Sequence, residues 1–189
     1  MDAHLFQIIN NLAGKVPWLD LLMILSAKYL PLVFAFALII LYLTFQAAQQ
    51  RVAVLAGIST LIALGIAQSI AFLDPRPRPY LTHVAHLLIE RTKDASFPSD
   101  HATFSFAIAI MLWRYNHKVG VILMGLAALV GFSRVFVGTH YPMDVIGGAA
   151  LGVFVSLVID YLSRQNRIRA LLDRFFVVLY EWRLAGKPE

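Results

Sequence analysis

Ser96-Phe97-Pro98-Ser99-Asp100-His101 stands directly before the apolar run Ala102–Trp113. Pro98 disfavours helix at Phe97, and the hydroxyl of Ser99 is of the kind that caps the first backbone N–H groups of a helix. These residues predict a helix that begins here. The free N–H groups of its first turn and the helix dipole attract phosphate-like anions. An ordinary helix cap with an interfacial histidine would give the same short pattern, so the rest of the chain has to decide.

The composition indicates that most of the chain lies in a bilayer. Of its 189 residues 59% are hydrophobic and 14% are charged, and the mean hydropathy is +0.71. Five runs are long enough, or nearly so, to span a membrane as helices: about Leu21–Phe45, Val52–Leu73, His101–Trp113, Val119–Val137 and Met143–Leu162. We therefore expect an all-α integral membrane protein, a bundle of about five transmembrane helices, possibly six, that forms one membrane-embedded domain over residues 1–189.

Two flanking segments are expected to lie on the membrane surface. Met1–Val16 alternates polar and apolar residues and has no basic region, which favours an interfacial amphipathic helix over residues 1–18 rather than a cleaved signal peptide. Arg164–Glu189 mixes basic and apolar residues, which predicts an amphipathic tail at 164–189. Its charges disfavour a sixth span.

The basic residues predict the topology. The formal net charge is +5, but the basic residues cluster after the first, third and fifth spans rather than in a nucleic-acid-binding patch. They are Arg51, Arg114, Lys118, Arg164, Arg167, Arg169, Arg174, Arg183 and Lys187. By the positive-inside rule that face is cytoplasmic, so the C-terminus is inside and the loops at 74–100 and 138–142 are outside. We expect a multi-pass membrane protein with no nucleic-acid partner, and the absence of cysteine excludes disulfides.

Small residues mark expected helix contacts. The second span is rich in alanine and glycine, and Gly148 and Gly152 stand four apart in the fifth span. Such spacing allows helices to approach closely. It predicts bundle packing and says nothing of function.

The loop Asp74–Tyr80 holds two arginines between alternating prolines. The prolines stop the second span and keep the segment extended, which fixes Arg76 and Arg78 in space. An arginine fork suits bidentate phosphate binding. Anchoring to lipid headgroups would use the same residues, and this loop alone does not separate the two interpretations.

Thr82–Asp94 predicts a short helix lying on the membrane. In such a helix His83, His86 and Glu90 would share one face. The segment lacks the pair of histidines four apart that is typical of a helical zinc site, so we expect no metal.

The segment from Ser133 to Asp144 carries the strongest chemical signal. Arg134 interrupts an apolar run, and a buried arginine normally faces a polar cavity or an anion. His140 lies just before the next helix and Asp144 lies inside it, so the carboxylate can orient the imidazole and raise its basicity. This segment, the Arg78 loop and the helix start at Ser99 all fall on one membrane face.

These motifs resemble the signatures of the type 2 phosphatidic acid phosphatase superfamily. Ser133-Arg134, His140 and Asp144 match the signature Ser-Arg-x5-His-x3-Asp in full. Pro98-Ser99-Asp100-His101 is similar to Pro-Ser-Gly-His, and Arg78-Pro79 is similar to the end of Lys-x6-Arg-Pro. Within the family, the residues of these motifs are most similar to those of bacterial undecaprenyl diphosphate phosphatases of the bacitracin-resistance type.

Two positions depart from the family pattern. Ala71 stands where the first signature has lysine, and Arg76 is the nearest cation that can replace it. Asp100 stands where the second signature has glycine. A carboxylate there would repel phosphate unless it points away, is protonated or pairs with an arginine.

The resemblance implies a phosphohydrolase that needs no metal and no cofactor. His140 would attack phosphorus and form a phosphohistidine, Asp144 would orient His140, and His101 would protonate the leaving group. The residues implied in substrate binding are Ser99, Arg78, Arg134, Arg76, Asp100 and Ser133. Arginines and a helix N-terminus can supply the charge stabilisation that phosphoryl transfer requires.

The expected substrate is a lipid whose phosphate lies at the outer interface, and the resemblance points to undecaprenyl diphosphate. Its hydrolysis to undecaprenyl phosphate would recycle the carrier lipid of cell-wall synthesis and remove the target of bacitracin. A phosphatidate or phosphatidylglycerophosphate phosphatase is the alternative of the same class. A lipid transporter or binding protein is the alternative of another class, because intramembrane charges also line translocation paths.

Overall fold

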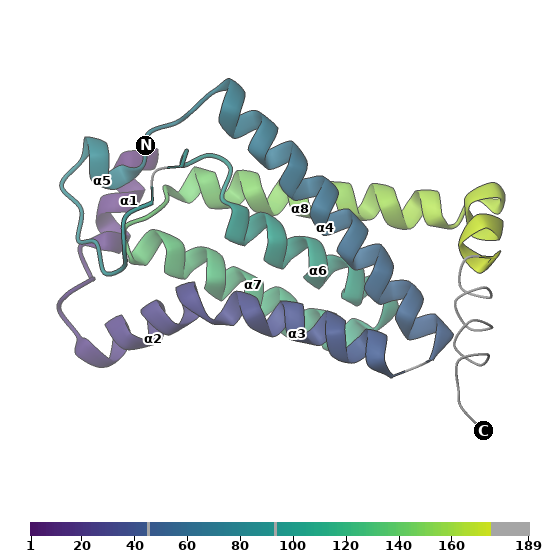
Figure 1. The fold of residues 1–189 in the computed structure, drawn as a ribbon. Coiled ribbons are helices and arrows are strands. Elements are labelled where there is room, and N and C mark those ends of the chain that lie inside the picture. Colours follow the sequence, from purple (N-terminus) through teal and green to yellow (C-terminus); the bar gives the residue numbers. More distant parts are fainter. Residues whose placement is uncertain (45, 93, 175–189) are drawn as a thin grey trace, which may run out of the picture.

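A computed structural model describes residues 1–44, 46–92 and 94–174. The described chain forms an elongated helical bundle (Figure 1). Its helices are α1 (Asp2–Asn10), α2 (Pro17–Lys28), α3 (Leu30–Leu43), α4 (Ala47–Leu73), α5 (Pro79–Thr82), α6 (Asp100–Tyr115), α7 (His117–Phe136) and α8 (Pro142–Ser163). Residues 166–174 are helical as well.

The first expected span is a pair of helices rather than one rod. α2 and α3 meet at Tyr29 with a bend of 42°. Pro31 explains the break, because it has no N–H to donate to the carbonyl of Ala27 and its ring crowds that carbonyl. The pair still follows one side of the bundle from end to end (Figure 1).

Not every expected span is long enough to cross a bilayer. α4, α7 and α8 meet the length and hydropathy of a transmembrane helix, and the α2–α3 pair counts as a fourth span if it is taken as one. α6 has 16 residues, or roughly 24 Å, against the roughly 30 Å of a hydrocarbon core. The chain is an all-α integral membrane protein, with five rods of which α6 is too short to span by itself.

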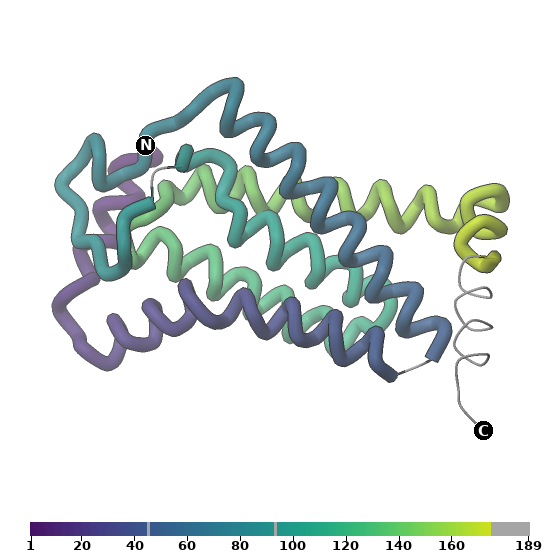
Figure 2. Tube along the Cα trace, viewed as in Figure 1, coloured from purple at the N-terminus to yellow at the C-terminus, as the bar shows by residue number. Residues whose placement is uncertain are grey.

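α6 is the central rod of the bundle. It packs against α4, α7 and α8, and Figure 2 shows its trace running between theirs. Ile108 and Met111 of α6 join Phe34 of α3 and Val130 of α7 in the largest cluster of buried apolar residues. The N-terminus of α6 is therefore held rigidly from several sides.

The expected close contact at the glycines of the fifth span is confirmed. A Cβ at Gly148 would lie 2.5 Å from the carbonyl oxygen of Ser99, and one at Gly152 would lie 2.4 Å from that of Thr103. Both neighbours are backbone atoms of α6 or of its N-cap, so neither can move aside alone. The two glycines thus set how closely α8 approaches the start of α6.

Gly152→Ala should lower the stability of the fold. The added methyl would force α6 and α8 apart, which costs about 1–3 kcal/mol for an overpacked core. Unfolding midpoints in detergent micelles measure the effect. Gly57→Ala is the matched control, because a Cβ at Gly57 of α4 would meet nothing within 4 Å; an equal midpoint shift in both variants would contradict the explanation.

The helix expected over Thr82–Asp94 is wrong. α5 ends at Thr82, and the described residues between it and α6 contain no helix. Long-range hydrogen bonds hold this segment instead: the backbone N–H of His86 donates to Oδ1 of Asn10 at 2.8 Å, and that of Leu88 donates to the carbonyl of Val137 at 3.2 Å. His83, His86 and Glu90 therefore do not share a helical face.

The ends of the chain agree with the expected helices in part. α1 covers residues 2–10 of the segment expected to be helical, and its Phe6 is fully buried. The ring of Phe6 packs edge-on against Tyr141 at 5.5 Å, so α1 lies over the start of α8. Of the amphipathic tail expected at 164–189, residues 166–174 are helical and residues 175–189 lie outside the described part of the chain.

Candidate active site

Three loops and a helix start meet at the end of the bundle that carries α1 and α5 (Figures 1 and 2). The backbone N–H of Ser96 donates to the carbonyl of Arg76 at 2.8 Å, and that of Ser99 donates to the carbonyl of Asp144 at 2.9 Å. These bonds join the loop after α4, the segment before α6 and the first turn of α8. The three stretches singled out in the sequence are thus brought to one place.

His140 lies between α7 and α8 with 2% of its side chain exposed. Its Nδ1 is 2.8 Å from the carbonyl oxygen of Ser96. Because a carbonyl can only accept, Nδ1 carries the proton and Nε2 keeps its lone pair. Nε2 lies 3.1 Å from Nη1 of Arg78. Nε2 therefore faces the guanidinium of Arg78.

The surroundings of His140 favour the neutral imidazole. Burial lowers the pKa of His140 from 6.5 to about 4, and the positive charges of Arg134 and Arg78 also lower it, whereas Asp144 raises it. Desolvation therefore outweighs the nearby carboxylate. At neutral pH Nε2 is therefore unprotonated, and its lone pair accepts a hydrogen bond from Nη1 of Arg78.

Acidification should destabilise the folded protein through His140. Its folded pKa of about 4 lies below the 6.5 of an exposed histidine, so the unfolded chain takes up the proton first. The contribution of the neutral His140 to the free energy of unfolding is fully present above pH 6.5 and is lost as the pH is lowered towards 4. Unfolding midpoints measured against pH should decline more steeply for the wild type than for His140→Gln, and parallel curves would contradict the burial of a neutral imidazole.

Asp144 is fully buried in the first turn of α8. Its Oδ2 accepts hydrogen bonds from Oγ of Ser96 at 2.5 Å and from the backbone N–H of Tyr141 at 2.8 Å. The same oxygen is 3.8 Å from Nδ1 of His140, which is too far for a hydrogen bond, and the neutral ring carries no charge to pair with it. Ser96 connects the pair, since its carbonyl holds His140 and its hydroxyl holds Asp144.

Arg76 faces carboxylates with both of its terminal nitrogens. Nη1 lies 2.5 Å from Oδ1 of Asp144 and Nη2 lies 2.6 Å from Oδ2 of Asp2, and the guanidinium stacks 4.3 Å from the ring centre of Tyr141. The sequence suggested Arg76 as a replacement for the missing phosphate-binding lysine. In the structure its two terminal nitrogens are engaged by carboxylates, an arrangement that fixes Asp144.

Arg78 is buried, and its guanidinium is already paired with the carboxylate of Asp94. Nη1 donates to the carbonyl of Thr139 at 3.0 Å, Nη2 donates to Oδ2 of Asp94 at 2.8 Å, and Nε donates to the carbonyl of Asp94 at 3.2 Å. Burial raises the pKa of Asp94, but Thr92 and Arg78 outweigh burial and hold that pKa below its ordinary value. A phosphate that binds Arg78 would compete with this carboxylate.

Arg134 and Ser99 leave buried polar atoms without partners. Nε of Arg134 and Oγ of Ser99 have no hydrogen-bond partner among the described residues, although Ser99 is fully buried and Arg134 is 5% exposed. The expected cap by the Ser99 hydroxyl is therefore absent, while α6 does begin at Asp100 with Ser99 as its N-cap. The charge of Arg134 acts on both His101 and His140. Buried donors without a partner in the protein are suited to hydrogen-bond an anion.

Asp100 and His101 lie at the edge of a lateral groove. The groove has a volume of about 260 Å³, and the other residues that line it are apolar: Pro31, Leu32 and Ala35 of α3, Leu64 of α4 and Phe104 of α6. Oδ2 of Asp100 accepts a hydrogen bond from Nε2 of Gln68 at 2.6 Å. Asp100, which replaces the glycine of the second signature, is thus hydrogen-bonded to a neutral amide of α4.

The sequence did not single out some residues of this cluster, and it assigned Ser133 to substrate binding, a role that its hydrogen bond does not favour. The hydroxyl of Ser133 donates to the carbonyl of Val130 at 2.7 Å within α7, which leaves it no proton to donate to a ligand. Asp94, Ser96 and Asp2 were not singled out as site residues. Ser96 is two residues before Pro98, but no spacing rule ties a backbone carbonyl to a distant histidine.

Comparisons with known proteins agree with this geometry. Residues 52–168 match the family model described as the PAP2 superfamily. The chain is 34% identical to undecaprenyl-diphosphatase BcrC of Bacillus subtilis, over 96% of this chain and 92% of the relative. It is 31% identical to the putative undecaprenyl-diphosphatase YbjG of Escherichia coli, over 96% and 90% of the two chains.

A solved structure has the same fold. The crystal structure of Aquifex aeolicus LpxE aligns with a TM-score of 0.70 and 26% sequence identity, over 84% of this chain and 93% of that chain.

Proposed function

Because the chain belongs to the PAP2 superfamily and is a phosphatase, we propose that it hydrolyses undecaprenyl diphosphate to undecaprenyl phosphate and phosphate. One observation carries the proposal: the buried His140 presents an unprotonated Nε2 to Arg78, beside the unpartnered donors of Arg134 and Ser99. A candidate nucleophile and candidate anion-binding donors are thus brought to the same end of the bundle. The named relatives support a lipid diphosphate as the substrate.

In the first step Nε2 of His140 attacks the terminal phosphorus. A nitrogen–phosphorus bond forms while the bond from phosphorus to the bridging oxygen breaks. Arg78 and Arg134 would stabilise the charge on the transferring oxygens, with the Ser99 hydroxyl as a further donor. Binding requires the phosphate to replace Asp94 in the fork of Arg78, where that carboxylate lies at 2.8 Å.

His101 protonates the departing bridging oxygen. It occupies the first turn of α6 at the edge of the groove between α3, α4 and α6. An isoprenoid chain fits such an apolar groove, which would direct the leaving group past His101. The product that leaves on this side is undecaprenyl phosphate.

Water completes the cycle by attacking the phosphohistidine. His101, left neutral by the first step, accepts a proton from that water. The nitrogen–phosphorus bond breaks, phosphate departs and Nε2 regains its lone pair. Asp144, held by Arg76 and Ser96, keeps His140 in one orientation and favours the charge that develops on the ring.

The proposal extends to location. A bacterial cytoplasmic membrane with the site on its outer face follows from the distribution of arginines at the other end of the bundle. Hydrolysis there would return the carrier lipid for cell-wall synthesis and would remove the target of bacitracin.

A substrate panel tests the proposal. Purified full-length protein is assayed for phosphate release from undecaprenyl diphosphate, phosphatidylglycerophosphate and phosphatidate, each with and without excess EDTA. We expect the highest kcat/KM for undecaprenyl diphosphate and no loss in EDTA. Preference for a phosphatidate-type monoester would overturn the substrate, and loss of turnover in EDTA would overturn the metal-free mechanism.

A further inference from the structure

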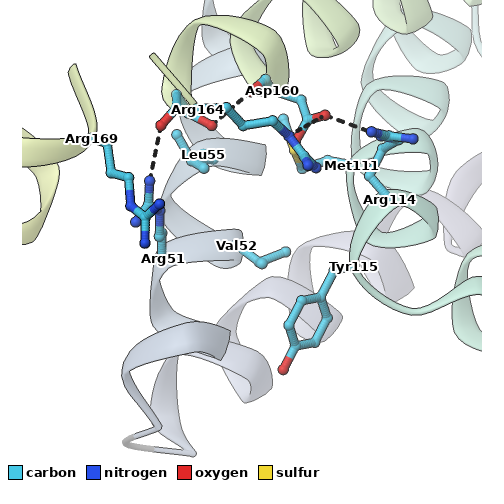
Figure 3. Close-up of a pocket in the computed structure, with 10 residues that line it drawn as sticks. Arg51, Val52, Leu55, Met111, Arg114, Tyr115, Asp160, Arg164 and Arg169 are labelled. Carbon is cyan, nitrogen blue, oxygen red and sulfur yellow. Dashed lines mark hydrogen bonds and ion pairs between the residues drawn. The ribbon is translucent and has the colours of Figure 1, made fainter. Parts of the chain in front are cut away.

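A cavity whose lining includes several arginines lies at the far end of the bundle from His140. Figure 3 shows it between α4, α6, α8 and the helical segment after α8. Its volume is about 260 Å³, and four of its lining residues are arginines: Arg51, Arg114, Arg164 and Arg169. No part of the proposed reaction uses this cavity.

The arginines of this cavity outnumber the acids that pair with them. Arg114 and Arg164 share Asp160, with nitrogen–oxygen distances of 3.0 Å each. Arg51 and Arg169 share Asp173, at 2.8 Å and 3.8 Å. Four positive charges on two carboxylates leave a surplus of two, which favours an anion.

Several donors point to no partner in the described chain. Arg114 bonds only through Nε, and the one ion pair of Arg169 is also made by Nε. Within the described part of the chain, the Nη groups of both residues and Nη1 of Arg164 make no hydrogen bond or ion pair, so they are available to a ligand. Such forked donors suit the oxygens of a phosphate group.

An apolar wall lies beside the arginines. Val52 and Leu55 of α4 and Met111 of α6 line the same cavity, and Figure 3 shows them next to the guanidinium groups. A free phosphate would gain nothing from this wall, whereas a phospholipid would place its first acyl carbons against it. The cavity also has no histidine among its lining residues, so a phosphate bound there meets no nucleophile of the kind proposed for catalysis.

We propose that this cavity binds the phosphate headgroup of an anionic glycerophospholipid from the leaflet opposite the active site. The single negative charge of the lipid would offset part of the surplus and join α4, α6 and α8 to the segment 166–174. Basic cavities at the ends of membrane helices are typical places for such headgroups. The site is separate from the catalytic one and does not depend on the substrate proposed above.

Native mass spectrometry of the full-length protein in detergent tests this site. Dioleoylphosphatidylglycerol, dioleoylphosphatidylcholine and inorganic phosphate are titrated separately into delipidated protein, and each unfolding midpoint is recorded. We expect one retained phosphatidylglycerol and a raised midpoint, with neither phosphatidylcholine nor inorganic phosphate giving the same shift. Equal shifts with inorganic phosphate would show a site for a soluble anion, and equal binding of phosphatidylcholine would show no charge recognition; either result overturns the proposal.

Variants locate the lipid. Arg114→Gln with Arg164→Gln should weaken phosphatidylglycerol binding about tenfold, which corresponds to two lost charge-assisted contacts. Arg167→Gln with Arg174→Gln is the charge-matched control, because both arginines are exposed and neither lines the cavity. Unchanged binding in the double variant, or equal weakening in the control, would overturn the site.

A milder variant covers the case in which the double variant does not fold. Arg169 is 65% exposed, and its one ion pair is long at 3.8 Å, so Arg169→Gln should fold normally. We expect it to weaken phosphatidylglycerol binding about threefold relative to Arg167→Gln, through the loss of one exposed contact. Binding equal to that control would overturn the site.

Discussion

His140→Ala is expected to lower kcat for phosphate release by about 10⁴-fold or more, the loss seen when a covalent nucleophile is removed. The physical reason is the lone pair on Nε2, which faces the guanidinium of Arg78 at 3.1 Å. Alanine leaves the arginines in place but supplies no atom that can bond to phosphorus. Single-turnover release of phosphate from undecaprenyl diphosphate measures the effect.

His86→Ala is the matched control for this variant. His86 lies at the same end of the bundle, and its hydrogen bonds to Asn10 are made by backbone atoms. Its side chain is exposed, so turnover should stay close to that of the wild type. Retained activity in His140→Ala would remove the nucleophile from the mechanism, and a severe loss in His86→Ala would revive a role for the histidines of the 83–94 segment.

Arg134→Met is expected to stop catalysis and to stabilise the empty protein. Arg134 is 5% exposed and has a buried Nε without a partner among the described residues. An unpaired buried charge costs several kcal/mol, so an apolar side chain of similar length should raise the unfolding midpoint. Loss of the same guanidinium from the transition state should lower kcat by about 10²- to 10³-fold.

Arg78→Met is the variant against which the unfolding midpoint of Arg134→Met is compared. Arg78 is just as buried, but its guanidinium donates to Thr139 and to Asp94. Its replacement should lower kcat to a similar degree and should lower the unfolding midpoint, because a carbonyl is then left buried without its donor. Thermal unfolding in detergent without phosphate shows whether each variant raises or lowers the unfolding midpoint. A fall in both variants would show that Arg134 is satisfied in the empty site, contrary to the structure.

The sequence predicted the framework of the site better than its contacts. His140 stands two residues before the start of α8 and Asp144 lies in its first turn, so the sequence could indicate that the two residues lie near each other. The start of α6 followed from Pro98 and Ser99, and the close contact of α8 followed from its glycines. Each of these features depends on local backbone preferences or on the size of one residue.

The remaining contacts depend on segments that are far apart in the chain. Arg76 meets Asp2 and Asp144, 74 and 68 residues away, and the helix expected at 82–94 gives way to bonds with Asn10 and Val137. Local periodicity carries no information on such pairs. The position of Asp94 in the fork of Arg78 belongs to the same class, because it requires the loop to fold back on itself.

Trapping of the phosphoenzyme tests the central claim most directly. Wild-type protein is mixed with undecaprenyl diphosphate labelled at the terminal phosphorus, quenched within one turnover in alkaline denaturant and digested for mass spectrometry. The account predicts a phosphoryl group on His140 that survives alkali, is lost in acid and is missing from His140→Ala. Full turnover in the same samples with no labelled His140 at any time point, or a label on another residue, would contradict it.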